Sequence, residues 1–245
     1  MPFTRRQRSR RSSTVQRAIR IHDARARQAG GAVVDVDGAR YDYRVERNAV
    51  TRTRVIRGGR TAGKAECFLL FLEPDGTSEL HGLKQAPDCA LSDGATGRQL
   101  VKAALTLARK GKATSMTLTD LSAKETGSGK KIRLADMYFL TTGQTWYESV
   151  IPGLVPVDNA EMIAEWRERV RTNTWDSVAQ GLRVRGVIIP SEFTDGIDTG
   201  HVGSAMVVLR RIKDAGTDLF ADYGEKLLLA SGIGPLYRTD WRVTL

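Results

Sequence analysis

The sequence is poor in the residues that build metal centres and nucleophilic active sites. Its 245 residues include two cysteines, Cys67 and Cys89, and three scattered histidines, His22, His81 and His201. The cysteines have no CxxC spacing, and none of the histidines stands in a GxSxG-type context, so we expect no metal site and no hydrolase triad. Two buried free thiols in a reducing compartment are the expected state of the cysteines.

Long apolar runs are also missing. No stretch approaches the roughly 18 to 20 residues that a membrane-spanning helix needs, so no such segment is expected. The N-terminal positive charges are not followed by an apolar stretch, which is unlike a secretory signal. With 41% hydrophobic and 27% charged residues, the chain has the composition of a globular protein of one large domain or one and a half.

Acidic residues are nearly absent from the first 28 positions. This segment, called the arm below, holds nine arginines and one acid, Asp23, and therefore carries +8 of the net charge of +10. The other 217 residues hold 29 basic and 27 acidic side chains, so the rest of the chain is almost neutral. The arginines of the arm are Arg5, Arg6, Arg8, Arg10, Arg11, Arg17, Arg20, Arg25 and Arg27.

Arginine pairs with phosphate through two parallel hydrogen bonds, and clustered arginines bind nucleic acid without reading its sequence. The arm is therefore predicted to bind nucleic acid or neighbouring proteins in a large assembly. Two alternatives stay open, a mitochondrial transit peptide and a solvated tail without a partner. Phosphorylation of Ser9, Ser12 and Ser13 would weaken the attraction to an anion.

Hydrophobic periodicity and turn signals predict an α+β protein. Alternating or compact apolar stretches indicate strands at 32–36, 40–45, 51–56, 65–72, 78–83 and 115–121. Helical spacing indicates helices at 97–110, 159–171, 175–182, 203–213 and 218–231. Between these lie a polar mobile loop (126–131), a strand or helix (132–140) and a short helix (144–148), and the chain ends in a strand or docked tail (236–245). We expect a basic, extended or disordered arm (1–31), an α+β domain (32–156) and a mostly helical region packed on it (157–245).

A loop of small residues, Ser92 to Gly97, runs into the first helix. Exposed backbone N–H groups at a helix start can hold a phosphate, which makes Ala95, Gly97 and Arg98 candidates for binding a pyrophosphate. A plain turn with Thr96 as the N-cap is the alternative. The loop is not a Walker A motif, because no Gly-Lys-Ser/Thr follows it.

The aromatic pair in Thr145-Trp146-Tyr147-Glu148 is a second candidate. Tryptophan and tyrosine have a large apolar body with one polar atom, so packing is the favoured role. A tyrosine that faces a cleft can also act as a general acid.

The order of paired strands, small-residue loop, helix, strand and Tyr-bearing segment resembles the Gcn-type N-acetyltransferase (GNAT) fold, a mixed sheet flanked by helices. The pyrophosphate loop of that family would fall on Ser92 to Gly97, where Ala95 replaces the usual Gly and Ser92 replaces Gln or Arg. The resemblance implies acetyl-CoA bound at Ala95, Gly97 and Arg98. It also implies that Tyr147 protonates the leaving thiolate.

A narrower resemblance rests on Leu118 to Ser122, the apolar stretch 132–140 and the run from Thr141 to Glu148. These segments are similar to a paralogous group of GNAT-like proteins in large nucleocytoplasmic DNA viruses, which carry Gly-Lys-Thr-Trp-Tyr-Glu. Gln144 stands where that group has Lys. The resemblance covers about 65–156.

The altered pyrophosphate loop and the charge of the arm favour a non-enzymatic structural protein of a large DNA virus particle. Such a minor capsid or virion-associated protein would need no cofactor, and would occur in the virion and in the host cytoplasm or nucleus during assembly. One alternative is an acetyl-CoA-dependent N-acetyltransferase. The second is a subunit of a ribonucleoprotein such as a ribosome.

Overall fold

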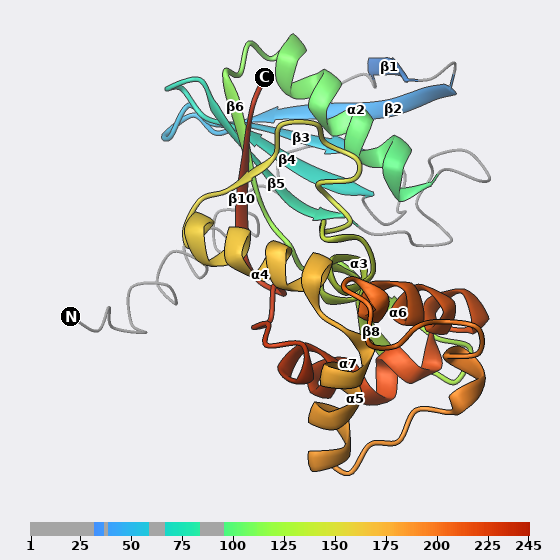
Figure 1. Cartoon of the computed structure of the whole chain (residues 1–245). Coiled ribbons are helices and arrows are strands. Elements are labelled where there is room, and N and C mark those ends of the chain that lie inside the picture. The colour runs from blue at the N-terminus through green and yellow to red at the C-terminus, as the bar shows by residue number, and fades with distance from the viewer. Residues whose placement is uncertain (1–31, 37–38, 59–66, 84–95) are drawn as a thin grey trace.

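The computed structural model describes residues 32–36, 39–58, 67–83 and 96–245, and the statements below concern these residues. The fold is α+β, with helices arranged around a mixed sheet (Figure 1). Among the described residues, eight strands form this sheet in the order β1-β2-β3-β4-β5-β6-β10-β9. Their bounds are β1 (Ala32–Val36), β2 (Ala39–Arg47), β3 (Arg54–Gly58), β4 (Phe68–Leu72), β5 (Thr77–Leu83), β6 (Ser115–Thr119), β9 (Val155–Pro156) and β10 (Asp240–Thr244).

The first five strands form an antiparallel meander. In β4 the side chains of Phe68, Leu70 and Leu72 are buried and alternate with less buried ones, as expected for a strand with one face on the core. The helix α2 (Gly97–Lys110) lies across the strands of this meander (Figure 1). Leu100 and Leu107 of α2 are fully buried in the resulting core.

The bounds of α2 are those expected from the sequence. Thr96 is the N-cap, and its side chain and that of Gln99 exchange hydrogen bonds with each other's backbone in a capping box. The helix stops at Gly111, where a Cβ atom would come within 2.4 Å of the Leu72 side chain. The interpretation of Thr96 as an N-cap is therefore confirmed.

The last strand of the chain joins the sheet beside β6, far from β1 at the opposite edge. β6 runs parallel to β5, because the chain crosses over through α2 between them. β10 pairs antiparallel with β6 on one side and with β9 on the other. Trp241 of β10 is fully buried. The sheet is therefore built from residues on both sides of Pro156.

A two-stranded sheet, β7 (Ala123–Glu125) and β8 (Lys131–Arg133), stands apart from the main sheet. Its turn contacts α7 (Asp218–Ala230), because Ser128 donates a hydrogen bond to Asp218 and Lys130 forms an ion pair with Asp222. The expectation of a mobile loop at 126–131 is wrong, since the segment is a hairpin turn docked on a helix.

The helices expected after Pro156 are confirmed. Together with α3 (Leu134–Thr142), they pack beyond the end of the main sheet (Figure 1). Their bounds are α4 (Ala160–Thr172), α5 (Trp175–Val184), α6 (Ser204–Ala215) and α7. The helices α5 and α7 approach closely at Gly181, where a Cβ atom would lie 3.1 Å from the Cα atom of Ala230.

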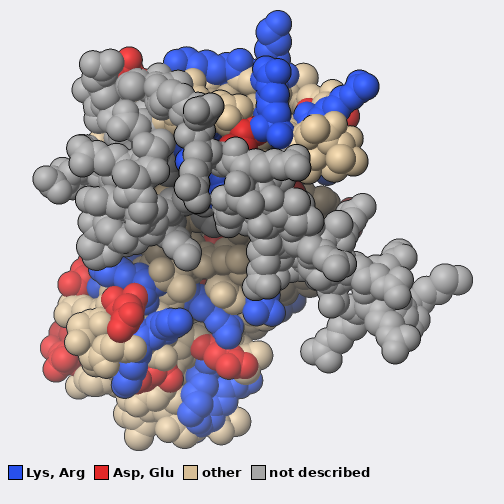
Figure 2. Space-filling model, turned by 180° about the vertical axis from the view of Figure 1, so that it is seen from behind, with Lys and Arg blue, Asp and Glu red and all other residues tan. Residues whose placement is uncertain are grey.

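Figure 2 shows basic and acidic side chains interspersed over the helical part of the molecule on the face that it draws. This mixture agrees with the small net charge of the chain outside the arm. The arm, the loop residues 92–95 and Cys89 lie outside the described residues.

Cys67 lies directly before β4 and is fully buried, as expected. It is disulfide-bonded, so the expectation of a free thiol is wrong for this residue. The sequence did not indicate a disulfide, because two isolated cysteines without a spacing motif do not show whether they approach each other.

None of the helices in the described part of the chain is both long enough and apolar enough to span a membrane.

Candidate active site

The parallel strands β5 and β6 separate before they end. Their pairing runs from Thr77 with Ser115 to Leu80 with Leu118 and then stops. β5 continues to Leu83, still paired with β4 across an irregularity in register. Among the described residues, no strand pairs with the end of β5 on the side facing β6, so backbone groups there are available to a ligand.

A cleft of about 310 Å³ lies at this separation. Its walls are mostly apolar, with hydroxyl groups from Thr119, Ser122 and Tyr147. An apolar hollow with a few converging polar groups is the usual form of a small-molecule site. The lining residues come from β5, α2, β6 and the segment after it, β7, α3 and the turn after α3: Leu80, Leu83, Gly97, Leu100, Thr119, Leu121, Ser122, Ala123, Leu134, Trp146 and Tyr147.

The amino-terminal end of α2 borders the cleft. Gly97, its first residue, faces Trp146, and a Cβ atom at this position would lie 3.2 Å from the indole ring. Arg98 points toward the same turn, where its guanidinium group reaches the backbone oxygen and hydroxyl of Ser149 at 3.4 and 3.3 Å. Gly97 therefore lines the cleft and Arg98 lies beside it, whereas Ala95 lies outside the described residues. Their predicted binding of a pyrophosphate stays a prediction.

The segment Thr145–Glu148 forms a closed turn rather than the expected short helix. The Glu148 carboxylate accepts a hydrogen bond from the Thr145 N–H at 2.7 Å, and the Thr145 hydroxyl accepts one from the Glu148 N–H at 3.2 Å. Arg167 of α4 holds Glu148 from outside at 2.5 Å. These contacts fix Trp146 and Tyr147 against each other, with ring centres 4.9 Å apart in an edge-to-face arrangement.

Tyr147 is buried and lines the cleft. In the described part of the chain its phenol oxygen has no hydrogen-bond partner, so the hydroxyl is available to a ligand. Burial, and then the charge of Asp120, raise the pKa of Tyr147 above its ordinary value. The phenol therefore keeps its proton at neutral pH and can serve as a proton donor.

Asp120 follows β6 directly and is fully buried. Its Oδ1 accepts hydrogen bonds from the Ser122 N–H at 3.0 Å and from the Ser122 hydroxyl at 2.5 Å. Its Oδ2 has no partner and is the only such carboxylate oxygen buried within the described residues. Burial raises the pKa of Asp120 to about 6, against the hydrogen bonds from Ser122 and with a smaller contribution from nearby carboxylates.

Those carboxylates are Asp136 of α3 and Glu148 of the turn. Asp136 accepts backbone N–H bonds from Leu236 at 2.8 Å and Tyr237 at 3.3 Å, while Glu148 is held by Thr145 and Arg167. Burial raises the pKa of Asp136. Within the described residues, Asp120 therefore differs from both neighbours in having a fully buried oxygen that no protein group satisfies.

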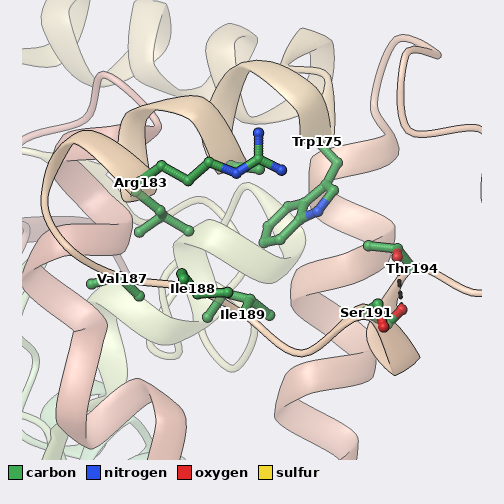
Figure 3. A pocket seen from close by; sticks show the side chains of 9 residues that line it. Trp175, Arg183, Val187, Ile188, Ile189, Ser191 and Thr194 are labelled. Carbon is green, nitrogen blue, oxygen red and sulfur yellow. Dashed lines mark hydrogen bonds between the residues drawn. The ribbon is translucent and has the colours of Figure 1, made fainter.

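Two smaller hollows lie on the helical part. One of about 290 Å³ between β8, α3 and α7 carries side chains of both signs, including Arg133, Asp222 and Glu225. The other, of about 140 Å³, lies under α5 (Figure 3), where the Trp175 ring and the Arg183 side chain face Ile189. In the first, the side chains of Arg133, Asp222 and Glu225 are exposed, and the second is mostly apolar. The cleft at β5 and β6 contains the buried phenol of Tyr147 and is therefore the better candidate.

The sequence analysis missed Asp120 and Ser122. Both belong to the stretch Leu118 to Ser122 that carried the resemblance, but no role was assigned to them. An Asp-x-Ser directly after a strand is a signal for a side chain that bonds its own backbone two residues on. The burial that changes its chemistry depends on elements far away in the chain.

Among the described residues, no group of His, Cys, Asp and Glu side chains is arranged to bind a metal ion. The arginines of the arm, which were predicted to bind nucleic acid or a partner, lie outside the described residues.

Comparison with known proteins found no protein-family model, no curated protein and no solved structure that matches this chain.

Proposed function

We propose that the protein is a GNAT-like acyltransferase that takes an acyl-CoA thioester, such as acetyl-CoA, in the cleft between β5 and β6. The observation that carries the proposal is the early separation of these two parallel strands beside the start of α2. The apolar walls suit the pantetheine arm. The end of β5 beyond Leu80, which pairs with no described strand on the side of β6, offers backbone groups to its amides.

The start of α2 would receive the pyrophosphate. The capping box uses the N–H of Gln99 and leaves those of Gly97 and Arg98 without partners in the described residues. Two such N–H groups at a helix start, beside the Arg98 guanidinium, favour an anion. Trp146 lies against Gly97, so it forms the wall between this end and the interior of the cleft.

Tyr147 is the proton donor in this proposal. An amine attacks the thioester carbonyl carbon, the C–S bond breaks, and the sulfur takes the phenol proton as it leaves. The position of the phenol in the lining of the cleft, without a hydrogen-bond partner among the described residues, supports this role. The cleft geometry favours the acyltransferase alternative over the non-enzymatic function that the sequence analysis preferred.

The test is thermal stabilisation by acetyl-CoA. A ligand that binds the folded state at 100 times its Kd adds about 2.7 kcal/mol, and this produces a rise in Tm of a few degrees. Gly97→Val, which places branched carbon atoms against Trp146, should abolish the rise. Gly127→Ala is the matched control, because a Cβ atom at Gly127 meets no atom within 4 Å. An unchanged Tm at millimolar acetyl-CoA would reject the proposal.

A second candidate is that the protein is a structural component of a large DNA virus particle, anchored through its arm. The observation that favours it is the concentration of +8 of the +10 net charge in residues 1–28. This role is compatible with an acyl-CoA cleft in the rest of the chain. A ribonucleoprotein subunit would use the arm in the same way.

Deleting residues 1–28 should remove salt-dependent binding to nucleic acid. Each phosphate contact contributes about −0.9 to the slope of log K against log salt on double-stranded DNA. The full chain and the deletion variant are compared by fluorescence anisotropy on a DNA duplex between 50 and 200 mM salt, roughly the range over which such contacts weaken. An unchanged slope in the deletion variant would contradict the role of the arm.

A further inference from the structure

Asp120 is a buried carboxylate, and the hydrogen bonds of its turn account for only one of its two oxygens. A turn that needs only an acceptor for the N–H of Ser122 is satisfied by Oδ1. Oδ2 is left buried without a partner, which costs free energy in any protein. Unsatisfied buried groups of this kind mark strain or chemistry.

Ser122 connects this carboxylate to the cleft. Its hydroxyl donates to Asp120 Oδ1 at 2.5 Å, and Ser122 itself lines the cleft. The Ser122 oxygen retains lone pairs that can accept a proton from a group bound in the cleft. A chain of two groups therefore leads from the cleft to a buried carboxylate.

Asp120 and Tyr147 differ in their protonation at neutral pH. The phenol of Tyr147 is the protonated partner, and the carboxyl groups of Asp136 and Glu148 are already held by N–H donors and, for Glu148, by Arg167. Burial raises the pKa of both groups, but Asp120, at about 6, still loses its proton at neutral pH while Tyr147 keeps its own, so base and acid roles can divide between them. Asp120 is thus the group near the cleft that can gain a proton.

We propose that Ser122 accepts a proton from the incoming amine and passes its own proton to Asp120, which acts through it. This inference rests on the proposed acyl transfer. The amine nitrogen bonds to the acyl carbon and loses one proton to the Ser122 oxygen, while the Ser122 hydroxyl proton moves to Asp120. The C–S electron pair stays on sulfur, which takes the Tyr147 proton. Water returns the proton from Asp120 to Tyr147 after release.

Asp120→Asn is the main test, because an amide oxygen still accepts the Ser122 bonds but the group cannot take a proton. The probes are acetyl-CoA with spermidine, L-lysine and an unblocked tetrapeptide, followed by thiol release in the full chain. We expect kcat to fall about 100-fold or more, in the range for loss of general base catalysis. KM for acetyl-CoA should stay unchanged.

The pH profile separates chemistry from a structural role. The wild-type rate should fall on the acid side with a midpoint near the pKa of Asp120, about 6, and Asp120→Asn should remove this limb. Ser122→Ala should lower kcat in the same way. Asp240→Asn is the matched control, since Asp240 also accepts a hydroxyl bond, from Thr119 at 2.5 Å, but is exposed.

The outcomes are distinguishable. Asp120→Asn with a rate within about threefold of wild type and the same acid limb would overturn the relay while acyl transfer stands; such a factor is under 1 kcal/mol. Acetyl-CoA that stabilises the fold with no thiol release on any probe overturns the relay and leaves acyl-CoA binding. Acetyl-CoA that neither stabilises nor reacts rejects the proposed function itself.

Discussion

The end of β5 and β6 that carries the cleft and the helical region that follows it differ in how closely their interiors are packed. Around α5 and α7, backbone meets backbone at Gly181 and the hollow under α5 is small, while the hollow of about 290 Å³ beside α7 has exposed charged side chains in its lining. Around β5 and β6 the strands part, a cleft of about 310 Å³ opens, and a buried carboxylate oxygen stays unsatisfied. Close packing gives stability, and departures from it concentrate where a protein does chemistry. The difference therefore locates the candidate site independently of any motif.

The largest expected effect tests whether the two regions are energetically separate. Trp241→Ala should cost about 3 to 5 kcal/mol, the usual range for removing a buried large aromatic side chain. Because β10 pairs with both β6 and β9, we expect a single unfolding transition in urea, seen alike by fluorescence and circular dichroism. Two separate transitions would show that the helices fold without the sheet. The neighbouring exposed Arg242→Ala should change stability by under about 0.5 kcal/mol.

A comparable effect should follow from pH through Asp120. Its pKa of about 6 in the folded protein lies above the ordinary 3.8, so the folded state holds the proton more tightly than the unfolded state. The free energy of unfolding therefore falls as pH rises from about 4 to about 6, by roughly 3 kcal/mol in total. Urea titrations of wild type and Asp120→Asn across this range isolate the effect, because other groups cancel in the difference. Parallel curves would contradict it.

The close approach of α5 and α7 gives a smaller effect. Gly181→Leu should destabilise by about 1 to 3 kcal/mol, since the new side chain meets the backbone of Ala230. Gly224→Ala in α7 is the control, because a Cβ atom there has open space. It should stabilise by up to about 1 kcal/mol through helix propensity. Equal effects of both changes in thermal unfolding would show that the packing contrast is wrong.

The smallest effect concerns the turn that holds Tyr147. Thr145→Val keeps the shape but loses the acceptor for the Glu148 N–H, and should cost about 1 kcal/mol, as for a lost helix cap. Acetyl-CoA stabilisation should weaken with it, because Tyr147 and Trp146 depend on this turn. Thr172→Val, at an exposed position in α4, provides the comparison in the same Tm measurement. If the Thr145→Val variant is stabilised by acetyl-CoA as much as the wild type, the site does not depend on this turn.

Local signals predicted α2 from end to end, because its start and stop depend on Thr96, Gln99 and Gly111, all within the helix or next to it. The α+β class and the helices after Pro156 were also predictable from periodicity, whereas the mixed sheet was expected only from the resemblance to the GNAT fold. The hairpin at 126–131 was not, since its order comes from Asp218 and Asp222, about 90 residues away. Long-range contacts of this kind leave no trace in a short window of sequence.

The residues of the candidate site were likewise predicted only in part from the sequence. Gly97, Arg98 and Tyr147 were found through the resemblance to a known family. Asp120 was passed over, because an aspartate after a strand reads as a turn residue. Its burial arises where residues after β6 meet Thr239 and the backbone of Arg238. That environment becomes visible only in three dimensions.

Pro156 and Trp241 face each other across paired strands, and the four helices α4 to α7 lie between these two residues in the chain. In evolutionary terms the helical region resembles an insertion, because the chain leaves the sheet and returns to it at one point. Chain inserted at such a point can lengthen, shorten or diverge without moving the register of the strands on either side. Selection on the helical region is therefore tied to selection on the cleft mainly where Arg167 of α4 holds Glu148.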